Sequence, residues 1–378
     1  MEYEKLIEPV AITNRLISIW PLDSHDSLES RFRPIHRVLM FTLATILGFA
    51  VLVDVIRLWE NIEEVTECAL ISSAIYLSLI RLIVYTIHEE DLQYLVKTMR
   101  SDWLDSPMQD KLILQDRCLF AFNLARYFII TVALALITFM VGPILELKFL
   151  GLKERKFPFR GYFHPNQTSD PIFGYLYVFN ALGGGLLGVT IMSATTINMI
   201  LVIHASAKFA VVSNRLELLK SDDVDVTEKI SLCIQRHQDA IFFAERVETT
   251  INILALCQFV ISTGLVCFAG FQISAMLKDH SRLMKYVSFL NSAIFELFLF
   301  SYSGQQLIVE STAVGDSSYA SDWVGARFTQ NIQILMMRSL TPSKITAAKF
   351  YDMSLMSFTS VLSTSFSYFT VLQSVNEE

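Results

Sequence analysis

Residues 357–374 read SFTSVLSTSFSYFTVLQS, and this stretch near the C-terminal end decides the fold class. A helix turns by about 100° per residue, so steps of three and four place side chains within an arc of roughly 100°. The residues on that arc are Ser357, Ser360, Thr364, Ser367, Val371 and Ser374. The opposite face carries Phe358, Val361, Leu362, Phe366, Phe369 and Leu372. Such a helix suits either a hydroxyl-lined pore with Val371 as a hydrophobic gate, or close packing through small residues against another helix.

The composition indicates a membrane protein. Of the 378 residues, 53% are hydrophobic and 18% are charged, whereas about 25% are charged in soluble domains. Seven apolar stretches reach the roughly 17–25 residues that a spanning helix needs. They lie at about 36–58, 68–88, 125–147, 173–203, 247–274, 284–308 and 349–374. The expected fold class is therefore an all-α membrane protein with seven transmembrane helices.

The distribution of Lys and Arg predicts the orientation of these spans. Connecting segments on the side of the N-terminus hold 18 such residues, and those on the other side hold nine. Cytoplasmic segments carry the excess of positive charge, so we expect a cytoplasmic N-terminus and an extracellular C-terminus. The glycosylation sequon at Asn166, read as Asn166-Gln167-Thr168, then falls in an extracellular loop.

Three ionisable residues fall inside the spans, where a charge is costly: Arg81, Glu146 and Glu296. Glu296 lies near the middle of the sixth span, so it must be protonated, hydrogen-bonded to a neighbour or facing a watery cavity. We expect a paired structural carboxylate. The glycine-rich run 183–188 in the fourth span predicts close helix packing, because it lacks the Lys-Ser/Thr that a phosphate-binding loop needs. We interpret the acidic residues of 60–67 as a solvated loop.

No pattern supports enzyme chemistry. The sequence contains no HExxH, CxxC or GxSxG motif and no P-loop, and the run 88–91 (HEED) is interpreted as solvated charge at a helix end. We therefore expect no catalytic residue, no metal, no cofactor and no nucleic-acid partner. Membrane lipid is an expected partner. The inverted orientation also excludes a G-protein-coupled receptor.

Several stretches of the C-terminal third carry a specific family pattern. They are 301–308 (SYSGQQLI), 346–351 (TAAKFY) and 365–372 (SFSYFTVL), together with the outer loop 157–165 (FPFRGYFHP). In these residues the chain resembles the insect odorant receptors. The short segment between spans four and five and the ending of 368–375 are typical of an odour-specific tuning subunit, not of the coreceptor.

The resemblance implies an odorant-binding subunit of a ligand-gated, nonselective cation channel in the plasma membrane of an olfactory sensory neuron. The partner would be the odorant receptor coreceptor, in a heteromeric, tetrameric channel whose last helices line the pore. The ligand would be a small, mostly apolar volatile, with small aromatic molecules as the expected class. The alternatives are a gustatory-type chemoreceptor channel and a transporter-like membrane protein without a gated pore.

Within a single seven-helix membrane domain, 1–378, we expect three parts. Residues 36–310 would form a six-helix ligand-sensing bundle, 311–348 a cytoplasmic anchor helix, and 349–378 the pore helix. Helical spacing of apolar residues predicts an assembly contact through Phe328, Ile332 and Leu335.

The resemblance places the ligand among the outer halves of spans two, three, four and six, and the expected ligand residues are chosen there from the helix faces. They are Ser72, Ile75, Tyr76, Thr138, Gly142, Phe179, Gly183, Phe289, Asn291 and Ala293. The expected pore and gate residues are Ser360, Thr364, Ser367, Val371 and Ser374.

Overall fold

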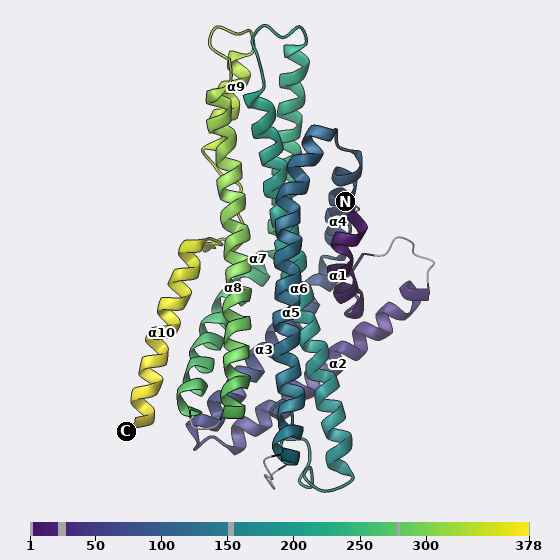
Figure 1. Cartoon of the computed structure of the whole chain (residues 1–378), viewed down its shortest axis with the longest axis vertical. Coiled ribbons are helices and arrows are strands. Elements are labelled where there is room, and N and C mark those ends of the chain that lie inside the picture. Colours follow the sequence, from purple (N-terminus) through teal and green to yellow (C-terminus); the bar gives the residue numbers. More distant parts are fainter. Residues whose placement is uncertain (1–2, 22–27, 150–154, 278–279, 378) are drawn as a thin grey trace.

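A computed structural model describes residues 3–21, 28–149, 155–277 and 280–377 (Figure 1). These residues are almost entirely helical. The helices are α1 (Tyr3–Leu16), α2 (Leu28–Arg57), α3 (Ile62–Ile87), α4 (Glu89–Asp105), α5 (Met108–Phe149), α6 (Ile172–Glu217), α7 (Val226–Ala275), α8 (His280–Ala320), α9 (Thr329–Ser339) and α10 (Leu355–Glu377). Two short strands, β1 (Thr346–Ala347) and β2 (Tyr351–Asp352), pair antiparallel just before α10.

Among the described residues, seven helices are long and apolar enough to cross a membrane, as the sequence predicts. They are α2, α3, α5, α6, α7, α8 and α10. Some run far past the roughly 20 residues that a span needs, since α6 has 46 residues and α7 has 50. Helices α6, α7 and α8 continue to the end of the molecule where α9 lies (Figure 1). The chain is a multi-pass membrane protein with long helices that project from one side.

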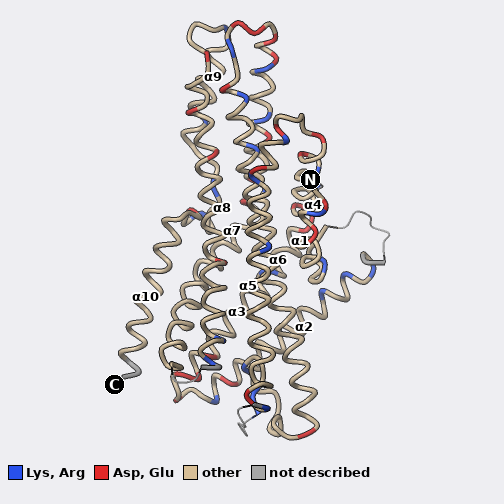
Figure 2. Tube along the Cα trace, in the orientation of Figure 1, with Lys and Arg blue, Asp and Glu red and all other residues tan. Residues whose placement is uncertain are grey.

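The projecting ends carry many charged residues, whereas the rest of the bundle is mostly apolar between its two ends. Figure 2 shows Lys, Arg, Asp and Glu gathered along the upper half and at the lower rim, with mostly uncharged helices between. Helix α10 lies wholly in the uncharged zone. This distribution matches helices that cross lipid in their lower halves and stand in water above it.

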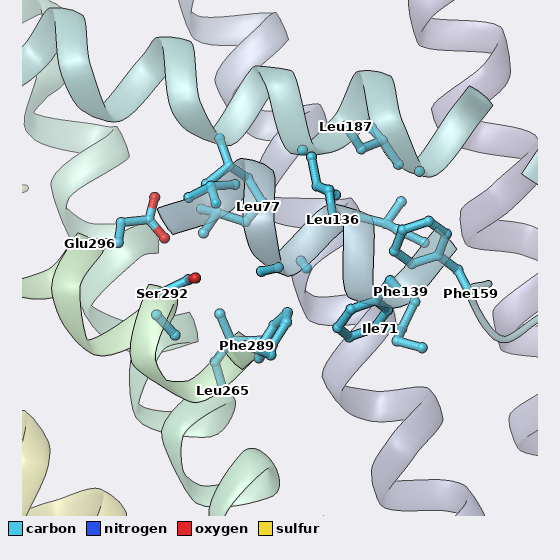
Figure 3. A pocket seen from close by; sticks show the side chains of 18 of the residues that line it. Ile71, Leu77, Leu136, Phe139, Phe159, Leu187, Leu265, Phe289, Ser292 and Glu296 are labelled. Carbon is cyan, nitrogen blue, oxygen red and sulfur yellow. The ribbon is translucent and has the colours of Figure 1, made fainter. Parts of the chain in front are cut away.

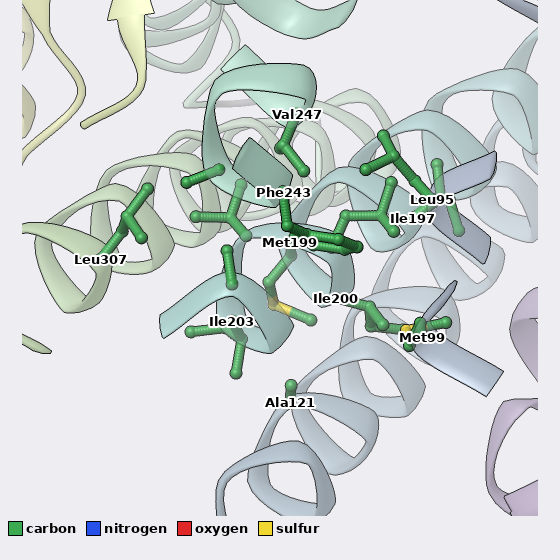
Figure 4. Packing of buried hydrophobic residues seen from close by; sticks show 14 of the residues in the cluster. Leu95, Met99, Ala121, Ile197, Met199, Ile200, Ile203, Phe243, Val247 and Leu307 are labelled. Carbon is green, nitrogen blue, oxygen red and sulfur yellow. The ribbon is translucent and has the colours of Figure 1, made fainter. Parts of the chain in front are cut away.

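Helix α6 is the centre of the bundle. Of its most apolar window, 83% is buried inside the chain, against 11% for α10 at the edge. It packs against α5, α7 and α8, and its Ile197, Ile200 and Ile203 are almost fully buried. Figure 4 shows these side chains meeting Phe243 of α7 and Leu307 of α8 in one apolar cluster. A helix that is apolar on all sides is stable in this central position.

The glycine run of α6 packs closely, as the sequence predicts. A Cβ atom built on Gly183 would lie 2.5 Å from the Leu47 side chain, and one on Gly188 would lie 2.5 Å from Leu136. Helix α6 continues through the run without a break. Small residues of this kind allow membrane helices to approach closely.

The last helix begins later than the expected start of the pore helix at residue 349. Residues 349–354 are not helical, and α10 begins at Leu355, because the chain turns through positive φ angles at Ala348 (47°) and Lys349 (68°) to form the hairpin. Glu248 of α7 accepts hydrogen bonds from the Thr346 hydroxyl (2.6 Å) and the Lys349 ammonium (2.7 Å). These contacts stabilise a backbone conformation that is unfavourable for non-glycine residues.

The segment 311–348 differs from the single anchor helix that the sequence predicts. Residues 311–320 continue α8, and α9 covers only Thr329–Ser339. The side chains expected to contact another subunit are buried inside this chain, with exposed fractions of 5% for Phe328, 0% for Ile332 and 3% for Leu335. They belong to its own apolar core, so their burial gives no support to an intersubunit role.

Gly304 of α8 sets the position of the chain that leads into α10. A Cβ atom at this position would lie 2.2 Å from the carbonyl oxygen of Met353, and the Met353 amide is held by the Ile345 carbonyl at 2.8 Å. Because the backbone at Met353 cannot retreat, we expect Gly304→Ala to cost about 1–3 kcal/mol of stability, as overpacking does. Thermal unfolding of the purified chain in detergent measures this loss.

Gly264→Ala in α7 is the matched control, since its Cβ would meet Phe268 at an ordinary 3.5 Å. Removing glycine from a helix interior is favourable by about 0.5–1 kcal/mol, so this variant should melt no lower than the parent chain. Equal melting temperatures for the two variants would contradict the assigned contact.

Candidate functional site

An apolar cavity of about 100 Å³ lies in the lower bundle, between the helices that cross the uncharged zone. We call it the inner cavity. Its wall comes from α2, α3, α5, α6, α7 and α8 and from the segment that joins α5 to α6. The lining residues are Leu47, Ile71, Ala74, Ile75, Leu77, Val132, Ala135, Leu136, Phe139, Phe159, Arg160, Gly184, Leu187, Gly188, Ile191, Leu265, Phe289, Ser292, Ala293 and Glu296.

The inner cavity is almost wholly hydrocarbon, with polar groups only at its ends. Phe139, Phe159 and Phe289 supply aromatic walls, and Ser292 and Glu296 lie together at one end (Figure 3). Phe159 lies at the opposite end in the same view. Such a wall binds a small apolar molecule by burial, while a hydroxyl fixes the orientation of one polar group.

A buried ion pair closes the end of the cavity at Glu296. Arg81 of α3 contacts the Glu296 carboxylate of α8 at 2.5 Å, with exposed fractions of 1% and 5% for the two side chains. The Thr195 hydroxyl of α6 donates to the same carboxylate at 2.7 Å, and Arg81 also donates to the Gln258 amide oxygen of α7. Glu296 is therefore paired, as the sequence predicts, and four helices meet at it.

A second space with a polar wall lies beside the segment 155–168, and we call it the outer chamber. Its volume is about 330 Å³, and the ends of α2, α3, α5 and α8 line it together with this segment. Acidic and basic side chains both line the outer chamber. They are Asp54, Glu64, Glu67, Glu146, Arg155, Lys156, Arg160, Arg282 and Lys285.

The acidic residues at the start of α3 are not the solvated loop that the sequence predicts. Glu67 is 7% exposed and accepts a hydrogen bond from Arg160 Nε at 2.8 Å, and from the Tyr286 hydroxyl. Glu64 pairs with the same guanidinium. Burial lowers the pKa of Arg160, and the negative charge of Asp54 opposes that shift. A guanidinium remains cationic in proteins, so it can hold these carboxylates in place.

The expected ligand residues divide into three groups. Ile75, Phe289 and Ala293 line the inner cavity, and Thr138 and Gly142 line the outer chamber. The others line neither space: Ser72, Tyr76, Phe179, Gly183 and Asn291.

The residues outside both spaces occupy neighbouring helix faces. The Tyr76 ring packs near Gly48 of α2, and Leu47 fills the room beside Gly183. Asn291 is exposed, whereas Ser292, the next residue, lines the inner cavity. One residue along a helix is a rotation of about 100°, which is enough to leave the cavity.

Sequence reasoning did not select Phe139, Phe159, Ser292 or Glu296 as ligand residues. Phe139 and Ser292 adjoin the expected Thr138 and Asn291, so the correct segments were found with the wrong rotation. Glu296 was recognisable as a charge in the middle of a span, with a watery cavity among its possible surroundings, but it was not selected as a ligand residue. Phe159 lies in a loop, for which helical periodicity gives no signal.

The expected pore residues form an exposed face of α10. Ser360, Thr364, Ser367, Val371 and Ser374 are all exposed, and Val371 is 58% exposed. The opposite face packs on α7 and α8 through residues such as Val361, which is buried. Phe366 was expected on this packed face, but its side chain is 66% exposed.

Other sequence-based expectations concern groups outside these spaces. Asn166 is exposed in the loop before α6, where a glycan has room. His88 Nδ1 lies 3.1 Å from an Asp91 carboxylate oxygen, a local contact at the start of α4. Within the described part of the chain, no three His, Cys, Asp or Glu side chains converge as metal ligands, and all five cysteines are unpaired.

Comparison with known protein families gives a match over most of the chain. The family model described as 7tm Odorant receptor matches residues 61–366. Odorant receptor 13a of Drosophila melanogaster is 26% identical over 329 residues, which cover 79% of this chain and 77% of that protein. Odorant receptor 67c of the same fly is 25% identical over 236 residues, which cover 60% of this chain and 58% of that protein.

The fold is also similar to solved structures. The insect olfactory receptor OR5 from Machilis hrabei, in complex with eugenol, matches with a TM-score of 0.87 at 19% identity over 98% of both chains. The structure of the same receptor described without eugenol matches with a TM-score of 0.85 at 18% identity over 98% of both chains. At these identities the likeness shows a shared fold.

The ion pair between Arg81 and Glu296 gives a direct test of the site's architecture. Arg81→Met leaves the Glu296 carboxylate buried without its partner, which costs about 3–5 kcal/mol. We expect a strong loss of folded protein, measured by size-exclusion chromatography and thermal unfolding. The double variant with Glu296→Met should recover much of the loss, because no uncompensated charge remains. Equal destabilisation by the single and double variants would contradict the pairing.

Proposed function

This chain belongs to the odorant receptor family, and from that premise we propose that it is the odorant-binding subunit of a ligand-gated, nonselective cation channel. The inner cavity is the proposed odorant site. The exposed hydroxyl face of α10 is its proposed share of the pore. The match to an odorant receptor family favours this function over a gustatory-type channel or a transporter.

The observation that carries the proposal is the apolar wall of the inner cavity. Burying about 200 Å² of apolar ligand surface contributes roughly 5 kcal/mol, before the costs of association. Ser292 offers one hydrogen-bonding group beside the aromatic walls of Phe139 and Phe289. The ligand is therefore a small neutral volatile, mostly apolar, with one polar group, and small aromatic molecules fit this description.

A contact between α8 and α10 close to the cavity supports communication between the cavity and α10. Glu296 lines the cavity, and Phe298 lies two residues further along α8. The Phe298 ring meets the Phe358 ring of α10 edge to face, with centroids 5.9 Å apart. A ligand that shifts this part of α8 would move the packed face of α10, and thereby its hydroxyl face.

The exposed face of α10 also supports a multi-subunit pore. A single helix cannot enclose a water path, so the hydroxyl faces of several subunits must meet around an axis. The proposed partner is the odorant receptor coreceptor, in a tetrameric assembly at the plasma membrane of olfactory sensory neurons. The N-terminus would lie in the cytoplasm and the C-terminus outside, as the Lys and Arg distribution indicates.

Recording current in cells that express this chain with and without the coreceptor tests the proposed function. Small neutral volatiles, with eugenol among them, are applied from outside. We expect ligand-evoked cation current only when both chains are present. Evoked current of full size from this chain alone would contradict the need for the coreceptor, and no response to any volatile would leave the odorant site without support.

A cavity-filling substitution tests the proposed odorant site. Ala74 of α3 lines the inner cavity, so Ala74→Leu should occupy ligand space and raise the half-maximal concentration of an activating volatile about tenfold or more. Ala69→Leu, on the same helix but outside the cavity wall, is the matched control. Dose-response curves at equal surface expression measure the effect, and an equal shift for both variants would remove the site from this cavity.

Val371 is the proposed contribution of this subunit to the closed gate. A ring of apolar side chains closes a pore by excluding water, so Val371→Ser should raise the resting cation leak without ligand. The increase should be partial, because the other subunits keep their own gate residues. Resting current at matched surface expression measures it.

The control for the gate lies on the packed side of α10. Phe369 is half-buried and lies near Gly270 of α7, so Phe369→Ser should disturb packing or expression instead of producing a leak. Equal leak from both substitutions, or none from Val371→Ser, would exclude Val371 from the gate.

A further inference from the structure

The inner cavity and the outer chamber are separated by two consecutive residues of the segment that joins α5 to α6. Phe159 and Arg160 line both spaces, and no other residue in the described part of the chain does so. Thr168, at the wall of the outer chamber, is exposed to solvent. The outer chamber therefore lies between the surface of the molecule and the apolar cavity, with Phe159 and Arg160 as the barrier.

The backbone at this barrier is fixed. The Phe159 amide donates to the Asn180 side-chain oxygen at 2.9 Å, and the Asn180 amide donates back to the Phe159 carbonyl at 3.1 Å. Asn180 of α6 is fully buried. Arg160 is held on the other side by Glu67 of α3 at 2.8 Å. Asn180 of α6 thus holds the main chain at Phe159, and Glu67 of α3 holds the Arg160 side chain, which leaves the Phe159 side chain as the part of the barrier without such a bond.

The Phe159 side chain is held by contacts of a different kind. Its ring stacks on Phe139 of α5, with centroids 5.3 Å apart and planes 18° from parallel. The ring also covers Gly184 of α6, where a Cβ atom would lie 2.0 Å from it. These are apolar contacts without a hydrogen bond, so rotation about the side-chain torsions needs no polar group to lose its partner.

We infer that the outer chamber is the access site of the odorant, and that the Phe159 side chain is the door between this chamber and the inner cavity. This inference rests on the proposed function of the cavity. A small neutral ligand enters the polar outer chamber, and it passes when the Phe159 ring swings off Phe139 and Gly184. Packing on Phe139 and Gly184 favours the return of the ring to its closed position behind the ligand.

The competing route is lateral, from lipid between the helices. The two routes differ in the role of Phe159, because a ligand from lipid reaches the cavity without passing it. A cysteine in the cavity wall reports the route without any odorant. Ser292→Cys is nearly isosteric and lines the inner cavity, and Ala135→Cys is a second reporter on α5.

The experiment measures how fast thiol reagents modify this cysteine in intact cells that express the full chain with the coreceptor. One reagent is a small cationic methanethiosulfonate that cannot cross the membrane, and the other is the neutral methyl methanethiosulfonate, which dissolves in lipid. Mass spectrometry of the purified chain measures modification. The chain with only its five native cysteines gives the background.

We expect Phe159→Ala to speed modification of the reporter by both reagents, by about tenfold or more, because the door is removed. Phe163→Ala is the matched control. Phe163 lies in the same loop and packs on Phe157 and Phe179, but it lines neither space. Phe163→Ala should leave both rates unchanged. If Phe159→Ala folds poorly, Phe159→Leu should show a smaller acceleration in the same direction.

Three results would overturn the inference. The first is rapid modification by the neutral reagent that is unaffected by Phe159→Ala, which indicates the lipid route. The second is equal acceleration by Phe163→Ala, which indicates general loosening of the loop. The third is an unchanged rate for the impermeant reagent in every variant. Because labelling requires neither an odorant nor a current, a negative result here is separate from a failure of the proposed channel function.

Discussion

The buried ion pair between Arg81 and Glu296 is the interaction on which the rest of the structure depends. A charge in the apolar half of a membrane bundle must be paired, and here the pair joins α3 to α8. Thr195 of α6 donates a hydrogen bond to Glu296 and Gln258 of α7 accepts one from Arg81, so one polar centre sets the separation of four helices. The inner cavity begins at Glu296, where this centre ends.

The pair also divides the bundle into two parts with different packing. On the side of the projecting helices, one large apolar cluster surrounds α6 and includes Phe243 and Leu307 (Figure 4). On the other side, a smaller cluster includes Ile71, Ile75 and Leu265, all of which also line the inner cavity. A tightly packed half that holds the helices together, and a more open half that contains the cavity, suit the proposed receptor function. The last helix packs on α7 and α8, which leaves its hydroxyl face exposed, as the proposed pore requires.

The sequence was sufficient for the fold but only partly sufficient for the site. Long apolar runs predicted all seven spans, because hydrophobic length is a property of the segment alone. The pairing of Glu296 followed from the cost of a buried charge. The rotation of each helix did not follow, since it depends on its neighbours. Thus Ile75 lines the cavity whereas Tyr76 packs near Gly48, and Ser292 does so whereas Asn291 is exposed. Phe328 and Ile332 illustrate a related limit of the sequence. Their helical spacing indicates that they are buried, but it does not say whether this chain or another subunit covers them.

The central claim is that a volatile bound in the inner cavity opens the channel to which this chain contributes α10. Cryo-electron microscopy of this chain assembled with the coreceptor, with and without a saturating volatile that evokes current, tests it most directly. The predicted result is ligand density bounded by Phe139, Phe289 and Ser292 in the first map only, together with a displaced α10. An empty inner cavity in both maps, with ligand density at another place in the open channel, would contradict the claim.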